Sequence, residues 1–361
     1  MESIKLKLKN YKCFQAAELD INNLTILLGA NAAGKSSIIQ SVLLYLKAVN
    51  MANSENKANI SLYKDFGYDM GVIEHLLYKN AEDENIVLEL DEHQVTINLK
   101  NQQKLSDVIT AETEHKDISY AYLCAERLGP RNTIEYHNSE NCGIHGEYTP
   151  YIISKIGERK ADIHKWFGTN LGETFSAQLD DWVQFIFPDI KVQASCQFNK
   201  IALLQVNSKG NWLIPTHVGF GVSYALPILV DGLRLLPGSW FIVENPEAHL
   251  QPKAQTQIGY FLGRMAAAGL RVIVETHSEH ILEGIAAVVQ SKEYGILKDY
   301  VSVFVLEQTS GRPCIRKASL QRSGVSKDEF PTDFFDYGKE QIQKDIESCS
   351  KKLEDIGDML L

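Results

Sequence analysis

The stretch LLGANAAGKSS (residues 27–37) decides the fold of this chain. Two glycines stand at the ends of a short loop, and Lys35 and Ser36 follow the second glycine. The apolar run LTILL (24–28) predicts a buried strand before the loop, and SSIIQSVLLYLKAV (36–49) has the apolar spacing of a helix after it. Strand, glycine loop and helix in this order are the context that a phosphate-binding loop requires.

Phosphate chemistry explains the residue types in this loop. Successive backbone N–H groups can surround an anion at the N-terminus of the helix, where the helix dipole favours negative charge. Lys35 would reach the β- and γ-phosphates of ATP, and the Ser36 hydroxyl would bind Mg²⁺. The alternative is a glycine turn that caps an ordinary helix, and the lysine, the serine and the spacing favour the nucleotide. We therefore expect the whole loop to bind ATP: Gly29, Ala30, Asn31, Ala32, Ala33, Gly34, Lys35, Ser36 and Ser37.

Composition narrows the class of protein. The chain has 361 residues, of which 44% are hydrophobic, so it can bury a large core. Its net charge of −10 argues against a broad basic surface for nucleic acid, although a local basic groove stays open. Six scattered cysteines without a CxxC pair indicate free thiols. The N-terminus does not resemble a signal peptide and the longest apolar segment is too short for a bilayer, so we expect a cytoplasmic protein with no membrane contact.

The order of the predicted elements indicates an α/β fold. From residue 239 onward apolar strand and helix patterns alternate, which predicts a parallel sheet of βα units. IKLKLK (4–9) predicts a half-exposed strand, and the polar stretch 51–61 predicts a surface loop. No heptad run is long enough for a coiled coil. We divide the chain into an N-terminal ATPase lobe with a β-hairpin (1–150), a mainly helical insertion (151–190), a C-terminal ATPase lobe (191–310) and a small segment that ends in a helix (311–361).

Two later strands end in residues that suit the second half of a nucleotide site. SWFIVENPEAHLQP (239–252) is an apolar strand that ends in carboxylates, and we expect Glu244 to hold Mg²⁺ while a neighbouring acid polarises the attacking water. RVIVETHSEHIL (271–282) ends at His277, which can hydrogen-bond a γ-phosphate or its water. The alternative for His277 and His280 is a pair of histidines that cap a helix.

These motifs resemble, in the same order, those of ATP-binding-cassette ATPases. The phosphate loop, FIVENPEAHL (241–250) and VIVETHS (272–278) carry the resemblance, and the opening KLKNYKCFQAAELDINNLTILLGANAAGKSSII (7–39) is similar to the branch with SMC, recombination-repair and OLD (overcoming lysogenization defect) ATPases. AERLGPR, GIHGEYT, HVGFGVSYALPIL and DEFPTDFFD also resemble a group of uncharacterised bacterial ATPases. The resemblance implies a mixed sheet with an antiparallel N-terminal portion in a cassette ATPase head.

The resemblance also implies a second set of phosphate ligands. VGFGVS (218–223) occupies the position of the cassette signature, which in that family closes on the γ-phosphate bound by the other subunit. Gly219, Gly221 and Ser223 would then act in a homodimer that ATP forms or tightens. The alternative is a glycine-rich helix start.

Some residues depart from the family pattern. Glu244 stands where an Asp is usual, and Asn245 replaces the usual catalytic Glu. Because Asn cannot act as a base at neutral pH, we assign that role to Glu247, and slow hydrolysis is the alternative. Asp69 is a candidate for the family's Gln loop, and Gln251, in place of a usual His, receives no role.

Three functions fit these features. The first is a dimeric ATP-gated switch that controls a separate effector protein, such as a nuclease, in bacterial anti-phage defence, which the resemblance implies. The second is an SMC-like DNA-maintenance ATPase, in which Lys5, Lys7, Lys9 and Lys12 would face DNA rather than solvent. The third, an ATPase subunit of a membrane transporter, fits the signature and the Gln loop poorly.

Overall fold

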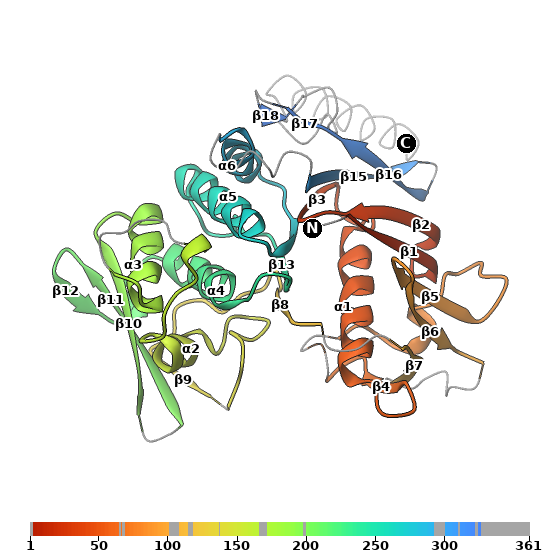
Figure 1. Cartoon of the computed structure of the whole chain (residues 1–361), viewed down its shortest axis with the longest axis horizontal. Helices are drawn as coiled ribbons and strands as arrows, with labels where there is room; N and C mark the ends of the chain where they lie inside the picture. Colours follow the sequence, from red (N-terminus) through yellow and green to blue (C-terminus); the bar gives the residue numbers. More distant parts are fainter. Residues whose placement is uncertain are drawn as a thin grey trace, which may run out of the picture.

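The structure is a computed structural model of the whole chain, and it describes residues 3–64, 66, 69–100, 108–114, 118–136, 138–165, 172–197, 200–291, 300–309, 311–321 and 324–325. Two arms flank a central sheet, with the N-terminal strands on one side and the segment from β9 to α4 on the other (Figure 1). The helix predicted at the end of the segment 311–361 and the DEFPTDFFD motif lie outside the described residues.

The central six-stranded sheet follows the order β16-β15-β3-β14-β13-β8. Five neighbouring strands, from β15 to β8, are parallel and β16 is antiparallel, which confirms the parallel sheet predicted from the alternation. Apolar branched residues fill these strands because both faces of the sheet are covered. The strands are β3 (Leu24–Gly29), β8 (Tyr120–Leu123), β13 (Trp240–Glu244), β14 (Arg271–Glu275), β15 (Val301–Thr309) and β16 (Arg312–Ala318).

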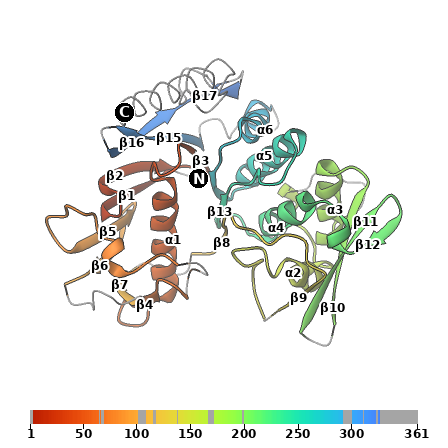
Figure 2. The ribbon, with the colours of Figure 1, turned by 180° about the vertical axis from the view of Figure 1, so that it is seen from behind.

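Two hydrophobic cores lie on opposite faces of this sheet. Along β3, Leu24, Ile26 and Leu28 belong to one core and Leu27 to the other, as the two-residue period of a strand requires. The first core packs α4 (Phe220–Arg234), α5 (Pro252–Ala267) and α6 (Glu279–Gln290), and the second packs α1 (Lys35–Met51). Both faces are visible when the molecule is turned around (Figure 2). The phosphate loop therefore joins a strand and a helix that are both held by buried side chains.

The second core is closed by a separate antiparallel sheet with the order β2-β1-β5-β6-β7-β4. The hairpin predicted around residues 86–98 is present as β5 and β6. The expected surface loop 51–61 is wrong in part, because Lys57–Ser61 pair with Val108–Glu112 and bury Ala58 and Ile60. The strands are β1 (Ile4–Tyr11), β2 (Phe14–Ile21), β4 (Lys57–Ser61), β5 (Asn85–Leu90), β6 (His93–Asn98) and β7 (Val108–Glu112), and a 3₁₀ turn, η1, covers Ile73–His75.

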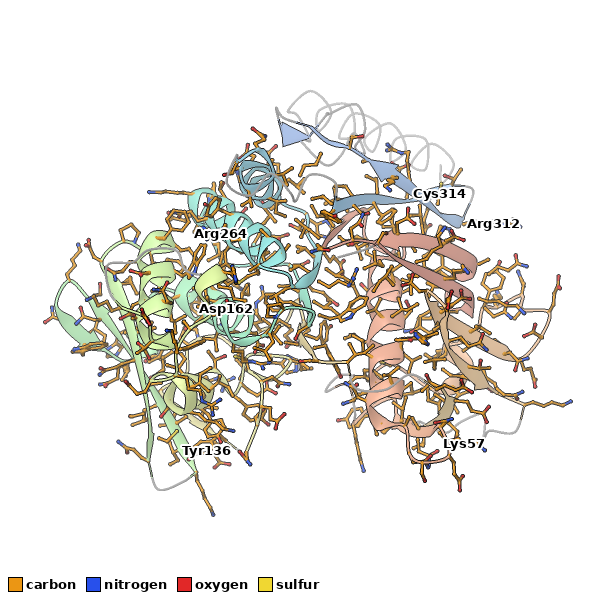
Figure 3. The ribbon with its side chains drawn as sticks, viewed as in Figure 1. Lys57, Tyr136, Asp162, Arg264, Arg312 and Cys314 are labelled. Carbon is orange, nitrogen blue, oxygen red and sulfur yellow. The ribbon has the colours of Figure 1, made fainter. Side chains whose placement is uncertain are left out.

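The other arm contains the helices expected within 151–190, namely α2 (Thr149–Ile156) and α3 (Phe175–Ile186). They pack on a sheet of β9 (Thr133–Glu135), β10 (Ile190–Gln197), β11 (Ile201–Ser208) and β12 (Asn211–Leu213). Tyr136, just after β9, lies at the outer end of this arm, and Lys57 lies at the outer end of the other (Figure 3). The remaining short elements are η2 (Ile163–Lys165), η3 (Pro215–His217), β17 (Leu320–Gln321) and β18 (Gly324–Val325).

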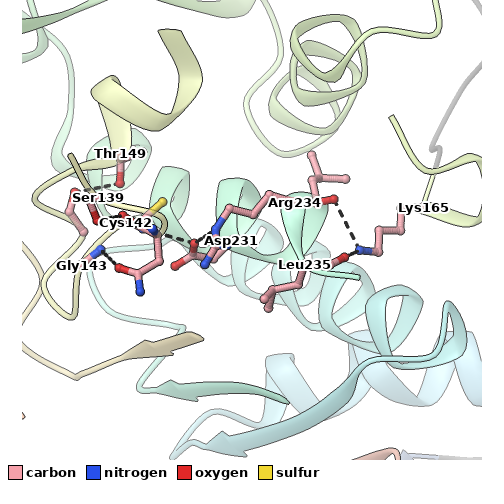
Figure 4. Close-up of polar contacts among 11 residues, drawn as sticks. Ser139, Cys142, Gly143, Thr149, Lys165, Asp231, Arg234 and Leu235 are labelled. Atoms are coloured by element: carbon pink, nitrogen blue, oxygen red, sulfur yellow. Dashed lines mark hydrogen bonds and ion pairs between the residues drawn. The ribbon is translucent and has the colours of Figure 1, made fainter. Parts of the chain in front are cut away.

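Helix α4 is fixed to this arm at its C-terminal end (Figure 4). The buried Lys165 Nζ donates to the carbonyl oxygens of Leu233 and Leu235, which an α-helix end leaves without intrahelical partners. Asp231 accepts from Arg234 Nε at 2.5 Å and from Cys142 N at 3.3 Å. The N-terminal end of the same helix carries the signature segment, so the position of that segment depends on how α4 is held.

Candidate nucleotide site

The phosphate loop has the backbone geometry that its glycines predict. Gly29 and Gly34 have φ angles of 134° and 104°, in a region that side chains disfavour. A Cβ at Gly29 would lie 2.0 Å from the Leu306 carbonyl oxygen, and one at Gly34 would lie 2.8 Å from the Phe14 ring. Both glycines are therefore required by close approach of neighbouring groups as well as by conformation.

Lys35 is held inside the loop. Its side chain is 4% exposed, and Nζ donates to the carbonyl oxygens of Gly29 and Ala30, each at 2.9 Å. Nζ also lies 3.6 Å from Glu275 Oε1. Burial lowers the pKa of Lys35, and the charge of Glu275 opposes that shift. The cation is thus in place before a phosphate arrives.

An open cavity of about 220 Å³ lies directly above the loop. Ser36 and Asn31 are exposed in it, so the predicted Mg²⁺ ligand and the loop's backbone face solvent. The side chain of Gln308 closes one edge by donating to the Ala32 carbonyl oxygen at 2.9 Å. The cavity is lined by Cys13, Asn31, Ala32, Gly34, Lys35, Ser36, Ser37 and Glu275.

Two carboxylates stand side by side beneath this cavity. Glu244 and Glu275 are the last residues of the parallel strands β13 and β14 and are paired in register. Burial and the charge of Glu244 raise the pKa of Glu275 to about 7, against the opposing effect of Lys35. Burial also raises the pKa of Glu244, while a hydrogen bond from the Tyr122 hydroxyl at 2.9 Å opposes the shift. Two adjacent acids whose ionised forms are disfavoured make a site that gains from a cation.

These residues fit the expected Mg²⁺. Among the described residues, the buried Glu275 Oε2 has no hydrogen-bond partner, and the charges of Lys35 and Arg127 offset that of the acid pair only in part. Carboxylate and hydroxyl oxygens are the protein ligands that Mg²⁺ accepts beside phosphate oxygens and water. Glu244 and Ser36 would hold the ion, which would neutralise the phosphates. Within the described part of the chain, no cluster of three or more His, Cys, Asp or Glu side chains suggests a different metal.

Glu247 is fixed by two hydrogen bonds. Its Oε2 accepts from the Thr276 hydroxyl and its Oε1 from the His277 backbone N–H, both at 2.8 Å. The carboxylate therefore braces the end of β14 against the turn after β13. It does not cap α5, which begins beyond Gln251 at Pro252. These bonds favour a bracing role, and the catalytic base assigned to Glu247 stays a prediction.

His277 lies at the edge of the same site with an exposed side chain. Burial of part of the ring and the nearby charge of Lys35 lower the pKa of His277, which favours the neutral imidazole. The cap of α6 is Ser278, whose hydroxyl accepts from His280 N at 3.1 Å and Ile281 N at 3.3 Å. His277 is thus free of a capping role and can face a phosphate.

The signature residues lie outside this cavity. Of the residues that the structure describes, Gly219, Gly221 and Ser223 do not line the space above the phosphate loop. Gly219 precedes α4 and Ser223 lies in its first turn. Gly219 is exposed, and a Cβ there would meet nothing within 4 Å. The structure brings Lys35, Ser36, Glu244, Glu275 and His277 together and leaves the signature apart.

The other candidate residues have local partners. Asp69 Oδ1 accepts from Gly71 N at 2.7 Å in a local turn, and Asp69 does not line the cavity within the described part of the chain. Lys12 Nζ donates to Gln40 Oε1 at 2.5 Å. The three lysines of β1 each meet an acid: Lys5 pairs with Glu18, Lys7 with Glu89 and Lys9 with Asp83, at 2.5–2.8 Å.

Two site residues were missed in the sequence. Glu275 was quoted within VIVETHS, but its pairing with Glu244 follows from the register of strands 31 residues apart. Arg127 was quoted within AERLGPR and proves to be 2% exposed, with its guanidinium on the carbonyl oxygens of Glu244 and Asn245. Arg127 follows the apolar strand β8 by four residues, beside Glu126, and nothing in that local sequence distinguishes it from an exposed arginine.

The chain belongs to the family described as "AAA domain, putative AbiEii toxin, Type IV TA system", whose model matches residues 24–283. This match and the loop geometry identify a P-loop ATPase domain of AAA type. No curated protein matches. In the described part of the chain, no helix combines the length and the apolar character that crossing a membrane requires.

Solved structures show the same fold in SMC heads. An SMC head bound to the C-terminal winged-helix domain of ScpA aligns with a TM-score of 0.51 and 12% identity, over 90% of this chain and 99% of that one. A head from Pyrococcus furiosus with an extended coiled coil, bound to the C-terminal domain of ScpA, aligns at 0.50 and 10%, over 89% and 97%. A head from Thermotoga maritima aligns at 0.45 and 12%, over 88% and 100%. The predicted head fold is confirmed.

Proposed function

We propose that this chain is a dimeric, ATP-gated switch that hydrolyses ATP slowly and controls a separate effector protein. Two copies would close around two ATP–Mg²⁺, each bound by the phosphate loop of one copy and the signature segment of the other. One observation carries the proposal. Within one chain the phosphate site is formed, and the start of the signature segment lies apart from it and is open to solvent.

The phosphate site of one chain surrounds the phosphates of a bound nucleotide on one side only. Lys35, the loop N–H groups and the Glu244–Glu275 pair cover one side of the phosphates, and the cavity above them opens to solvent. A phosphoryl transfer needs donors around the whole γ-phosphate, since charge spreads over its oxygens in the transition state. The missing donors would come from a second copy.

The start of the signature segment is open to solvent at Gly219 and Phe220, while Gly221 and Ser223 are half-buried. Phe220, next to Gly219, is 56% exposed, and it is among the few large apolar side chains of the described residues that face solvent. The N–H groups at the start of α4 can bind an anion, as helix N-termini do. We infer that Gly219, Gly221 and Ser223 contact the γ-phosphate of the partner, while the Phe220 ring is covered.

We propose a separate effector because of what the family description names and what related structures are bound to. The family description names a putative toxin of a toxin–antitoxin system, and two of the solved SMC heads are bound to ScpA, a separate protein. We propose that this head also acts on another protein, in anti-phage defence and in an OLD-like branch of the family. Asn245 at the position of the usual base supports slow turnover, so that ATP occupancy itself is the state that the effector reads.

DNA maintenance is the second candidate, and the strand lysines do not favour it. Because Lys5, Lys7 and Lys9 are each paired with an acid, the face of β1 carries little net positive charge for phosphates. The acidic net charge of −10 points the same way.

Sedimentation of the purified protein with and without a non-hydrolysable ATP analogue and Mg²⁺ tests the dimer. We expect the analogue to shift the protein from monomer to dimer, because each composite site needs ligands from two chains. Ser223→Arg should abolish the shift while leaving nucleotide binding. Ser195→Arg, the same change at an exposed position of β10, should leave it intact.

Two results would reject this proposal. The first is a sedimentation coefficient that the analogue does not change, although the nucleotide binds. The second is a dimer that persists in Ser223→Arg, which would place the interface elsewhere. The switch would be supported if the effector copurifies with the ATP-bound wild-type dimer and does not copurify with Lys35→Ala.

A further inference from the structure

The signature segment packs on the acid turn of its own chain, which we define as residues 244–250. The rings of Phe220 and His249 are stacked with centroids 5.6 Å apart, and the Tyr224 ring lies 4.3 Å from that of His249. His249 is exposed and has a left-handed backbone with a φ of 60°. Three rings therefore join the start of α4 to the turn that follows Glu244.

Two glycines permit this contact. A Cβ at Gly221 would lie 3.2 Å from Leu250 Cδ2 and 3.3 Å from the His249 carbonyl oxygen. A Cβ at Gly129 would lie 3.1 Å from the Phe220 ring. The motifs AERLGPR and VGFGVS, which the nucleotide site did not explain, thus meet at the acid turn, and their glycines serve the close approach.

Arg127 lies at the centre of this contact. Its side chain is 2% exposed, Nη1 donates to the Cys124 and Glu244 carbonyl oxygens at 2.9 and 2.7 Å, and Nη2 donates to the Asn245 carbonyl oxygen at 2.5 Å. Its guanidinium carbon lies 5.9 Å from the centre of the Tyr224 ring. One buried cation thus contacts the end of the acid strand and the signature helix.

A guanidinium suits this position. Its planar fork donates to three carbonyl oxygens while its flat face lies near an aromatic ring, and an ammonium group has no such face. Asn245 has a φ of 42°, in the left-handed region that asparagine adopts more readily than most side-chain-bearing residues, and its carbonyl oxygen receives one of the three bonds from Arg127. Arg127 therefore adds side-chain bonds to a turn that is also held by the bond from Asn245 N to the Glu275 carbonyl oxygen and by Glu247.

We propose that Arg127 is a positioning residue that couples the ATP site of a protomer to the signature segment of that same protomer. ATP at the acid turn and a partner's phosphate at the signature would each bias the same contact of Arg127, Tyr224 and His249. Coupling of this kind is reciprocal. In the proposed dimer, this coupling would make the affinity of each ATP site depend on whether the other site is occupied. That consequence rests on the existence of the dimer.

Hydrogen–deuterium exchange in a monomer tests the coupling without relying on the dimer. In Ser223→Arg, we expect ATP and Mg²⁺ to slow exchange at residues 30–36, and also at residues 219–224 by several-fold. Adding Arg127→Lys should remove the response at 219–224 and keep that at 30–36. His249→Ala should also remove the response at 219–224, because it removes the ring that contacts Phe220 and Tyr224. Arg131→Lys, in the same segment as Arg127, is the matched control and should keep both responses.

The outcomes separate this inference from the proposed function. Protection at 219–224 that is absent with Ser223→Arg alone, or that survives both Arg127→Lys and His249→Ala, would overturn the coupling and leave the phosphate loop assignment standing. If residues 30–36 are not protected in any variant, ATP binding itself fails and the coupling fails with it. In dimers that keep Ser223, the single change Arg127→Lys should also lower the Hill coefficient of turnover toward one.

Discussion

The phosphate loop and the signature segment both place glycines before the first turn of a helix, and the two differ in what surrounds them. Gly29 and Gly34 have positive φ angles and neighbours that leave no room for a side chain. Gly219 has a φ of −58° and no neighbour within 4 Å of an added Cβ. The first loop is enclosed by its own chain at both glycines, whereas the second is open at Gly219, where its own chain leaves the space free.

The largest expected effect concerns the completed loop. Lys35→Ala should abolish measurable ATP binding, a loss of at least about a hundredfold, because the buried ammonium is the fixed positive charge opposite the phosphates. Calorimetric titration with ATP and Mg²⁺ measures the loss, and Lys47→Ala on the same helix is the control. Unchanged affinity in Lys35→Ala would reject the phosphate loop.

The comparison of the glycines gives the next largest effect. Gly29→Ala should destabilise the protein by more than about 3 kcal/mol, because the new Cβ would meet the Leu306 carbonyl oxygen in a strained backbone. Gly219→Ala should change stability by less than about 0.5 kcal/mol, as exposed substitutions do, and still weaken the ATP-driven dimer. Urea unfolding and sedimentation measure the two. Equal losses of stability would remove the distinction between the regions.

The role of Glu247 is tested by turnover. Glu247→Gln should lower the rate by at least about a hundredfold with ATP affinity largely kept. If Glu247 acts by bracing His277, Thr276→Val should reproduce most of the loss of turnover, because it removes the hydrogen bond from the Thr276 hydroxyl and leaves the Glu247 carboxylate in place. If Glu247 is the base, Thr276→Val should keep the rate. Asn245→Glu should speed hydrolysis, and a rate that does not rise would argue against a base missing at that position.

The smallest effect comes from the acid pair. Folding raises the pKa of Glu275 from its ordinary 4.5 to about 7, so the folded state binds more protons and stability falls as pH rises through that window. Wild type should lose about 2 kcal/mol from this group between pH 4.5 and 7, after allowance for solvent screening. Between the same two pH values, the free energy of unfolding of Glu275→Gln, measured in urea, should fall by that amount less than the free energy of unfolding of wild type. Parallel losses would contradict the shift.

The sequence predicts features whose cause is local. Gly29, Gly34 and Lys35 stand in one loop between a strand and a helix with clear periods, so their roles follow from neighbours along the chain. The parallel sheet was predictable for the same reason. The end strand β4 was not, since the polar residues of Lys57–Ser61 form a strand only through pairing with Val108–Glu112.

Roles that depend on distant partners could not be predicted. Glu275 is significant because strand register places it beside Glu244, and Arg127 because β8 lies next to β13 in the sheet. Glu247 looked available as a base until the structure showed both its oxygens bound to the Thr276–His277 segment. In each case tertiary packing decides what the side chain contacts.

The most direct test of the central claim mixes two inactive variants. Lys35→Ala keeps its signature and loses its phosphate loop, whereas Ser223→Arg keeps its phosphate loop and loses its signature. With different tags on the two, we predict that ATP and Mg²⁺ make each variant pull down the other but not itself, because only the mixed dimer contains one complete site. A mixture that shows no more ATP-dependent association than either variant alone would contradict the account of a site shared between two chains.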